Sequence, residues 1–302
     1  MSGPQGPDTL PSIMGSPLHF EAPTALEYFG TLVADDASLS LVEAAVAIAQ
    51  DDNPQLDTQA VLAQIDTLAD RLKRRVPADA GPRQRLRVLN HFFFQELGFS
   101  GNVNNYYDPG NSLLSTVLET RRGIPITLAV LYIELATQIG LTARGVSFPG
   151  HFLIKLRLSE GEVVIDPFTG QSLSREQLDE LLAPYRHSQG LTGDFDVPLG
   201  LFLQAAPARD VLARMLRNLK EIHRAASDWP RLLAVLNRLV VLLPQSWEER
   251  RDRGMVQAEL GAVDAAVLDL ADYLAHAPEA ADRTAVGERL LTLREPGSGP
   301  IH

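Results

Sequence analysis

Apolar residues recur at the spacing of a helix face from about residue 23 to residue 98. The clearest stripe consists of Val61, Ile65, Leu68 and Leu72. Residues that start or stop helices stand at suitable places around these runs: Thr24 and Asp57 as N-caps, Pro82 at a first helical position, and Gly98 after a helical end. The pattern predicts an all-helical N-terminal region.

The next stretch is polar and then strongly apolar. Residues 99–111, "FSGNVNNYYDPGN", have the composition of a structured loop, and a short helix capped by Asn111 or Ser112 is expected after them. The following run, "GIPITLAVLYIELATQIG", predicts a helix that begins near Pro125 and stops at Gly140. It has little polar surface, so we expect it to lie at the centre of the core.

Three further apolar runs have the composition of β-strands: "TARGVSF", "HFLIKLRL" and "EVVIDPF". The segment "SEG" at 159–161 between the last two is typical of a hairpin turn. Helices followed by a few sequential strands indicate an α+β fold with a small antiparallel sheet.

After a predicted loop at about 184–207, the pattern is helical again to about residue 293. Pro244 and Pro278 each end a helical stretch and lie 34 positions apart, the period of a tetratricopeptide unit. We expect small residues at helix crossings in this repeat at Gly254, Gly261 and Ala266. Two units are fewer than an independent solenoid needs, so the repeats should pack against the rest of the protein.

These patterns divide the chain into three parts. The predicted parts are a disordered leader over 1–22, a helical region with the core over 23–200, and helical repeats over 208–293. The leader is rich in Gly, Pro and Ser and lacks the basic start and apolar stretch of a signal peptide. No apolar run is long enough to span a membrane. A cytoplasmic location is therefore the expectation.

Composition then excludes several classes of function. Of 302 residues, 45% are hydrophobic and 22% charged, as in ordinary globular proteins, and the formal net charge of −11 disfavours binding to nucleic acids or anionic membranes. The chain has no cysteine, which excludes disulfides, zinc–thiolate sites and thiol nucleophiles. Histidines occur at no metal-ligand spacing, and no phosphate loop or dinucleotide fingerprint is present. We expect no metal and no cofactor.

The candidate chemistry lies at His151 and Asp166, which stand at the start of one predicted strand and the end of the next. In papain-like and transglutaminase-like enzymes, a cysteine at the start of the core helix precedes a histidine strand and an aspartate strand. The helix dipole lowers the thiol pKa in those enzymes. The order of elements matches this architecture, but the helix here begins at Pro125, which has no nucleophilic atom.

Four motifs, "YYDPGNS", "RRGIPITLAVLY", "GVSFPGHFLIK" and "VIDPFTG", resemble the SirB family of bacterial proteins. The resemblance covers roughly residues 24–290. It implies a papain/transglutaminase-like core followed by tetratricopeptide-like repeats. It also implies that "GIP" replaces a Gly-x-Cys segment, with Pro125 at the place of the usual cysteine.

Three interpretations of His151 and Asp166 follow. The first is a degenerate active site kept for binding or structure. The second is a hydrolase with a hydroxyl nucleophile, Thr127 or Ser112. In the third, His151 bonds a backbone carbonyl and Asp166 makes an Asx-turn, so that both are structural.

A cluster of polar and aromatic residues precedes the core helix and consists of Asn102, Asn104, Asn105, Tyr106, Tyr107, Asp108 and Asn111. The cluster forms either a loop held by side-chain hydrogen bonds to its own backbone or one wall of a pocket near His151. Arg121 and Arg122 are candidates for binding an anion there. The ligand-binding candidates are Tyr107, Asp108, Asn111, Ser112 and Thr127.

The leading hypothesis is a pseudoenzyme: a non-catalytic regulatory module that binds a protein or peptide through its vacated cleft, its repeats or both. The alternative is an acyl-transfer or amide hydrolase that uses His151, Asp166 and a Ser or Thr hydroxyl. A third hypothesis is a structural subunit, for which the sequence gives no oligomeric state.

Overall fold

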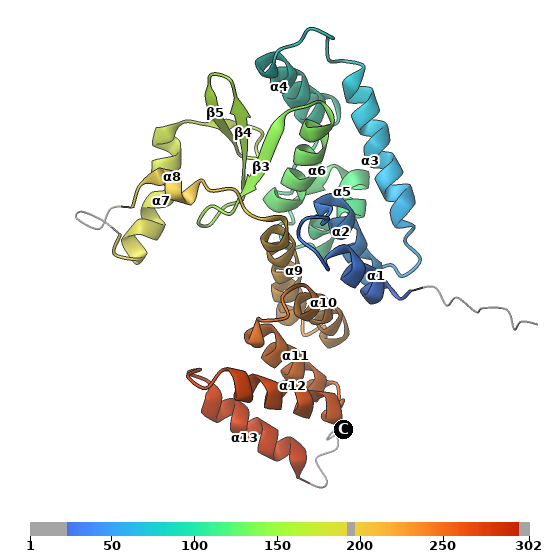
Figure 1. Ribbon diagram of the computed structural model, residues 1–302, viewed down its shortest axis with the longest axis vertical. Coiled ribbons are helices and arrows are strands. Elements are labelled where there is room, and N and C mark those ends of the chain that lie inside the picture. The colour runs from blue at the N-terminus through green and yellow to red at the C-terminus, as the bar shows by residue number, and fades with distance from the viewer. Residues whose placement is uncertain (1–22, 192–196, 296–302) are drawn as a thin grey trace, which may run out of the picture.

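The computed structural model describes residues 23–191 and 197–295, and the predicted leader over 1–22 lies outside this part of the chain. The N-terminal region is helical, as predicted (Figure 1). Its elements are α1 (Ala25–Leu32), α2 (Leu41–Ala47), the 3-10 turn η1 (Ile48–Asp51), α3 (Thr58–Lys73), α4 (Pro82–Asn90) and the π-helical turn η2 (His91–Glu96).

The predicted helix caps are present in this region. Thr24 and Glu27 form a capping box at the start of α1, and the Asp57 carboxylate accepts a hydrogen bond from the amide of Ala60 at 3.0 Å. Gly98 adopts φ +70° just after η2, the left-handed conformation that favours glycine at helix ends. The stripe predicted on α3 is buried.

Helix α6 (Pro125–Gln138) is the centre of the core, and nine of its 14 residues are buried. Helices α2, α3, α4 and α5 (Leu114–Thr120) surround it, and the sheet covers another side (Figure 1). Pro125 occupies its first turn, where no amide is needed, and Gly140 follows its end with φ +74°. The prediction of a buried central helix is confirmed.

The sheet is antiparallel, with the order β3 (Thr142–Val146), β4 (Leu153–Leu158), β5 (Gly161–Ile165) and β6 (Ser172–Leu173). Alternate residues of β4 face opposite sides, because side chains alternate along a strand. Ile154 joins the cluster around α6, whereas Leu153 packs with Leu178 and Leu182 of α7 (Arg175–Ser188). The α+β fold with a small antiparallel sheet is therefore confirmed.

Two details of this part differ from the sequence-based prediction. The predicted loop at 184–207 begins too early, because α7 continues through Pro184 to Ser188 and α8 (Leu199–Phe202) forms after it. Proline reads as a helix breaker, but packing of the α7 leucines on the sheet overrides that preference. The short parallel pair β1 (Ser100–Gly101) and β2 (Arg122–Gly123) also carried no recognisable strand pattern.

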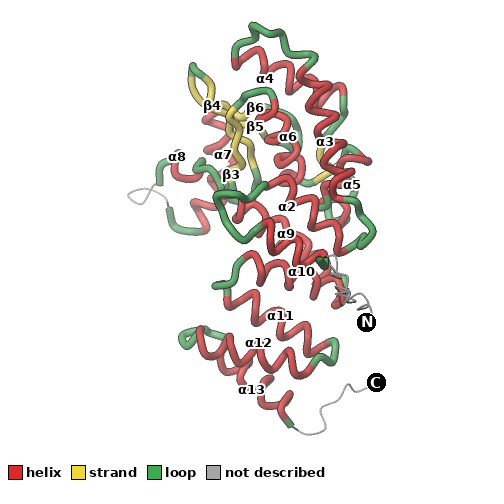
Figure 2. Tube along the Cα trace, turned by 45° about the vertical axis from the view of Figure 1, so that its right-hand side comes forward, coloured by secondary structure: helices red, strands yellow, loops and turns green. Residues whose placement is uncertain are grey.

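The C-terminal part is a stack of antiparallel helices (Figure 2). Its elements are α9 (Ala208–Ala225), α10 (Trp229–Leu242), α11 (Trp247–Glu259), α12 (Val263–His276) and α13 (Arg283–Arg294). Pro244 and Pro278 each follow a helix end by two residues, as the 34-residue period predicts.

The small residues of the repeat have two different roles. A Cβ at Gly254 would lie 3.0 Å from side chains of Asp269 and Leu270, so α11 and α12 cross closely there, as predicted. The prediction for Gly261 is wrong. It is exposed in the turn between the two helices and has φ +75°, so glycine is required by backbone conformation and not by a crossing.

Helix α9 joins the repeats to the core. It contacts α2 and α6 as well as α10, and its buried Leu212, Met215 and Leu216 belong to the same hydrophobic cluster as α6. The repeats therefore pack against the rest of the protein, as expected. The division of the chain at residues 200–208 stays a prediction. Across residues 23–191 and 197–295, none of the helices combines the length and apolar character needed to cross a membrane.

Candidate functional site

A tight turn places His151 at the start of β4. The amide of His151 donates to the carbonyl of Phe148 at 2.9 Å, with Pro149 and Gly150 at the two central positions of the turn. Gly150 has φ +72°, which a type II turn requires at its third residue. The "PG" pair thus turns the chain so that the imidazole stands at the end of the sheet that faces the start of α6.

His151 shares a cavity of about 50 Å³ with Pro125, and Tyr106, Arg214 and Asn218 also line it. We call it the end cavity. The structure thus brings the histidine next to Pro125 at the start of the core helix. Within the described residues, neither ring nitrogen of His151 forms a hydrogen bond, to a backbone carbonyl or to another group.

The Asp166 side chain forms hydrogen bonds within its own loop, which follows β5. One carboxylate oxygen accepts the amide of Phe168 at 2.9 Å, and the other accepts the Thr169 hydroxyl at 2.9 Å. This is an Asx-turn closed by Gly170, whose amide donates to the Asp166 carbonyl at 2.8 Å. Asp166 does not line the end cavity, so it does not orient His151 in this structure.

The Asp166 turn braces the polar loop at 102–111. The amide of Gly101 donates to the carbonyl of Phe168 at 3.0 Å, and a Cβ on Gly101 would stand 2.2 Å from the Phe168 ring. The Tyr106 ring lies 6.1 Å from the Phe168 ring. Asp166 therefore supports a wall of the site through Phe168.

Thr127 is fully buried in the first turn of α6. Its hydroxyl lies 2.7 Å from the Asn111 carbonyl oxygen and 3.0 Å from that of Ile124, either of which can accept its proton. The residue thus ties the polar loop to the core helix. The Thr127 proton is therefore already donated to a backbone carbonyl, unlike that of Ser112.

Asn111 and Ser112 do not cap α5, whose N-cap is Leu113 without a side-chain bond. They lie instead in the 3-10 turn η3 (Pro109–Ser112), because Asp108 caps that turn at the amide of Gly110. The Ser112 side chain is completely buried, and its Oγ has no hydrogen-bond partner among the described residues.

The loop itself is held by side-chain hydrogen bonds, as one interpretation predicted. The Asn111 amide donates to the carbonyls of Asn105 and Tyr106 at 2.6 and 3.1 Å, and Asn102 donates to Asn111 at 3.0 Å. These bonds fix the backbone and leave Tyr107 projecting outward with 77% of its surface exposed.

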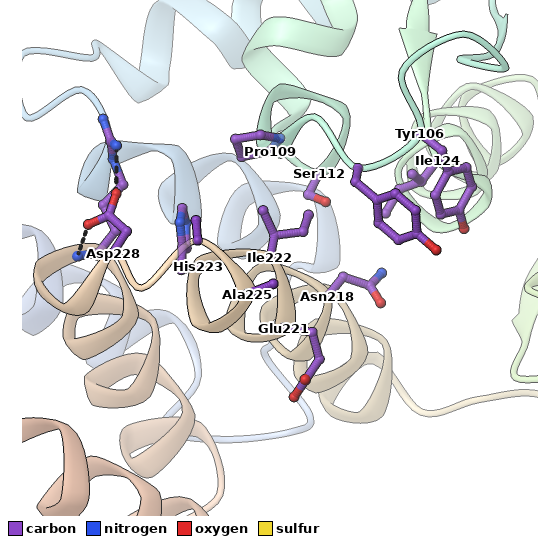
Figure 3. A pocket seen from close by; sticks show the side chains of 13 residues that line it. Tyr106, Pro109, Ser112, Ile124, Asn218, Glu221, Ile222, His223, Ala225 and Asp228 are labelled. Carbon is purple, nitrogen blue, oxygen red and sulfur yellow. Dashed lines mark hydrogen bonds and ion pairs between the residues drawn. The ribbon is translucent and has the colours of Figure 1, made fainter.

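A groove of about 770 Å³ lies between this loop and α9, and we call it the core groove. Figure 3 shows Pro109 and Ser112 on one side and Asn218, Glu221 and Ile222 of α9 on the other. Ser112 is directed toward α9 in this view. The groove therefore combines a wall from the core with a wall from the first repeat helix.

His223 is the second buried polar residue of the core groove. Only 4% of it is exposed, and its ring nitrogens form no hydrogen bond with the described residues. Burial lowers its pKa, opposed by the carboxylates of Asp52 and Asp228 and assisted by Arg231. The imidazole is neutral at pH 7 and offers one donor and one acceptor.

A second groove, of about 620 Å³, lies between α11 and α13, and we call it the repeat groove. Its charged side chains are already paired across the helices. The ion pairs are Arg224–Asp252 at 2.9 Å, Arg251–Asp282 at 2.5 Å and Arg289–Glu259 at 3.1 Å.

The contribution of α9 to the site was not predicted, and the two arginines predicted to bind an anion lie elsewhere. Arg121 stacks on Phe99 at 4.7 Å, and Arg122 donates to the Gly98 carbonyl at 2.7 Å, so neither lines the end cavity. Arg214 lies there instead. Arg214, Asn218 and His223 follow the amphipathic pattern of an ordinary repeat helix, and no motif marks them.

Among the described residues, no three or more His, Asp or Glu side chains lie together in a position to hold a metal ion.

Comparison with known proteins gives the same two-part organisation. Residues 59–217 match the model of the transglutaminase-like superfamily, and residues 219–291 match a tetratricopeptide repeat model. The two matches meet within α9, the helix that belongs to both parts. The predicted architecture of a transglutaminase-like core with C-terminal repeats is confirmed.

Several bacterial proteins named UPF0162 are similar over most of their length. One from Xylella fastidiosa is 39% identical over 241 residues, which cover 80% of this chain and 85% of the relative. Others come from Pseudomonas aeruginosa, 28% identical over 87% of this chain and 94% of the relative, and Vibrio cholerae, 26% identical over 81% and 88%.

Proposed function

The chain belongs to the UPF0162 family, and because its transglutaminase-like core lacks a cysteine, we propose that it is a non-catalytic regulatory module that binds a peptide segment of a partner protein in the core groove. Tetratricopeptide units bind proteins in many contexts, and α9, the helix that leads into the repeats, supplies one wall of this groove.

The observation that carries the proposal is the unmet hydrogen-bonding capacity of the groove. Ser112 and His223 line the same groove; the Ser112 hydroxyl is a buried oxygen without a partner among the described residues, and the His223 ring, 4% exposed as a residue, forms no hydrogen bond with them. Buried polar groups in folded proteins are almost always hydrogen-bonded, because an unpaired one costs about 1–3 kcal/mol. A bound ligand with donors and acceptors at both places removes this penalty.

The dimensions support a peptide as the ligand. The wall from Asn218 to Ala225 spans seven helical rises, or about 10 Å, which corresponds to about three residues of extended chain. Figure 3 shows that the lining continues beyond this wall to Asp228 at one end and Tyr106 at the other. Pro109, Ile222 and the tyrosines give the groove apolar surface that can pack against the side chains of a peptide. The few polar groups can form hydrogen bonds with its backbone.

Selection from a fluorescein-labelled library of random eight-residue peptides tests this function. We expect peptides that bind the wild-type chain to lose at least about tenfold in affinity for Ala225→Trp, because the indole fills the core groove. Ala285→Trp is the matched control, since Ala285 is also exposed on a helix of the stack but lines the repeat groove. Peptides weakened by the control and not by Ala225→Trp would contradict the proposal.

The hydrolase alternative has a separate test. Thr127 is enclosed and hydrogen-bonded, while Ser112 and His151 line different cavities, so the described geometry favours neither hydroxyl as a nucleophile. We expect a fluorophosphonate probe to leave the chain unlabelled. Labelling of Ser112 or Thr127 that disappears in His151→Ala would overturn the non-catalytic proposal.

A further inference from the structure

Arg214 differs from the other arginines of α9 in having no carboxylate partner among the described residues. Arg209 pairs with Asp36 at 2.7 Å, Arg217 with Glu249 at 2.8 Å, and Arg224 with Asp252 at 2.9 Å.

The surroundings of Arg214 are aromatic. Its guanidinium carbon lies 5.4 Å from the centre of the Phe152 ring, and Tyr106 lies beside it in the end cavity. The side chain is half-buried, and desolvation lowers its pKa, opposed by the Tyr106 phenol. Arginine stays protonated in such an environment, so the end cavity holds a poorly solvated positive charge.

Other groups of the end cavity also favour an anion. Helix α6 begins there with no side-chain cap, and its first-turn amides carry the positive end of the helix dipole. His151 contributes a ring that can donate a hydrogen bond, and Asn218 contributes an amide. No Asp or Glu of the described residues lines this cavity.

The end cavity and the core groove are separate but adjoin each other. Tyr106, Ile124 and Asn218 line both. A ligand in the core groove beside the unpartnered Ser112 hydroxyl can therefore extend one end toward Arg214. The end cavity, at about 50 Å³, has room for a carboxylate but not for a chain that continues through it.

We propose that the core groove binds the C-terminal end of a partner peptide, whose free α-carboxylate binds Arg214 and His151 in the end cavity. This inference rests on the proposed function and specifies the chemistry of the ligand. Guanidinium and carboxylate form short, charge-assisted hydrogen bonds, and the desolvated setting strengthens them. The end cavity beside Pro125 would thus bind the terminal carboxylate of a partner chain.

The experiment compares two versions of the same random eight-residue library, one with free C-terminal acids and one with C-terminal amides. We expect selected free acids to bind the full chain at least about tenfold more tightly than the same peptides as amides. Arg214→Gln should abolish that difference, and Arg214→Lys should retain part of it. A third version, amidated but with aspartate as its last residue, should bind no better than the other amides.

Control variants separate anchoring from folding. Arg217→Gln makes the same charge change one turn away on α9 and should keep the acid preference, since its partner Glu249 also pairs with Lys220. Because Arg214 packs on Phe152, the melting temperature of each variant is measured together with its peptide affinity. His151→Ala is a second test, and it removes no hydrogen bond of the described residues. Its expected effect is a reduced acid preference.

The outcomes also distinguish this inference from the proposed function. Equal binding of acids and amides would overturn the carboxylate anchor while leaving peptide binding in the core groove intact. Binding of aspartate amides as tightly as free acids would overturn the assignment to a chain terminus. No binding from any library would overturn both.

Discussion

The core groove and the repeat groove are similar in size and both contain ion pairs, but they differ in the hydrogen bonding of their other polar groups. The core groove is about 770 Å³; among the described residues its buried Ser112 hydroxyl has no partner, and its His223 ring forms no hydrogen bond. The repeat groove is about 620 Å³, and its arginines already bind carboxylates. Volume alone therefore does not identify a binding site, whereas unmet hydrogen-bonding capacity points to one of the two.

The charges of the repeat groove are better explained by stability. Burial would raise the pKa of Asp252, but hydrogen bonds and charges from Lys220 and Arg251 outweigh it, so its pKa is lowered. The pKa of Asp282 is lowered by a hydrogen bond from the Tyr273 hydroxyl and then by Arg251. These carboxylates join α9, α11, α12 and α13 to one another.

The most severe expected effect comes from the helix that supports the core groove. Leu131→Asp places an unpaired carboxylate at the centre of α6, where Leu131 is 2% exposed, and we expect loss of cooperative folding, because burying such a charge costs several kcal/mol. Leu131→Met is the control and should lower the free energy of unfolding by less than about 1.5 kcal/mol. Thermal melts measure both. A near wild-type melt for Leu131→Asp would mean that the core groove does not depend on this packing.

A smaller effect is expected in the repeats. Gly254→Val forces a branched side chain into the crossing of α11 and α12 and should lower the free energy of unfolding by about 1–3 kcal/mol. Gly287→Ala on α13 meets nothing within 4 Å and should be neutral or stabilising by up to about 1 kcal/mol. Chemical denaturation measures the difference. If Gly254→Val weakened peptide binding under folded conditions, the two grooves would not be independent.

The pH dependence of stability should separate the two grooves. The folded-state pKa of His223 is below its ordinary value of 6.5, so the unfolded chain takes up the proton first and stability falls as the pH drops below 6.5. The folded-state pKa values of Asp252 and Asp282 are below 3.8, so their contribution is present above 3.8 and is lost as the pH falls through the folded values.

Variants identify the residue that is responsible for each of these two pH ranges. His223→Gln should flatten the stability profile as the pH falls below 6.5 and leave the acid limb unchanged, whereas Asp282→Asn should affect mainly the acid limb. Denaturation midpoints across pH 3 to 8 provide the measurement. A His223→Gln profile identical to wild type would show that the core-groove histidine is not a desolvated group.

The sequence predicted much of the fold because its elements carry local patterns. Two of these patterns are local: the caps at Thr24 and Asp57, and the buried run after Pro125. A third is the repeat period, which is visible as the 34-residue spacing of Pro244 and Pro278. Helix α7 was missed, since Pro184 obscures a helix that packing on the sheet stabilises. Local patterns thus predict regular helices well, but they do not predict a helix that continues through a proline.

The candidate site was less predictable because it is assembled from distant segments. Pro125 and His151 were placed near one another by the order of elements, and they do share the end cavity. Arg214 and His223 reach the site only through the packing of α9 on the core, and nothing in their spacing marks them. Gly261 was assigned to a helix crossing from its position in the repeat, because a glycine fits both a close helix crossing and a left-handed turn.

The measurement that tests the account most directly is the effect of Ser112→Ala on stability and on peptide binding. Removing a buried hydroxyl without a partner should raise the free energy of unfolding of the free chain by up to about 1 kcal/mol. The same change should weaken selected peptides by about five- to tenfold, because it removes a hydrogen bond that forms only in the complex. A less stable Ser112→Ala chain with unchanged peptide affinity would contradict the claim that the core groove is kept unsatisfied for a ligand.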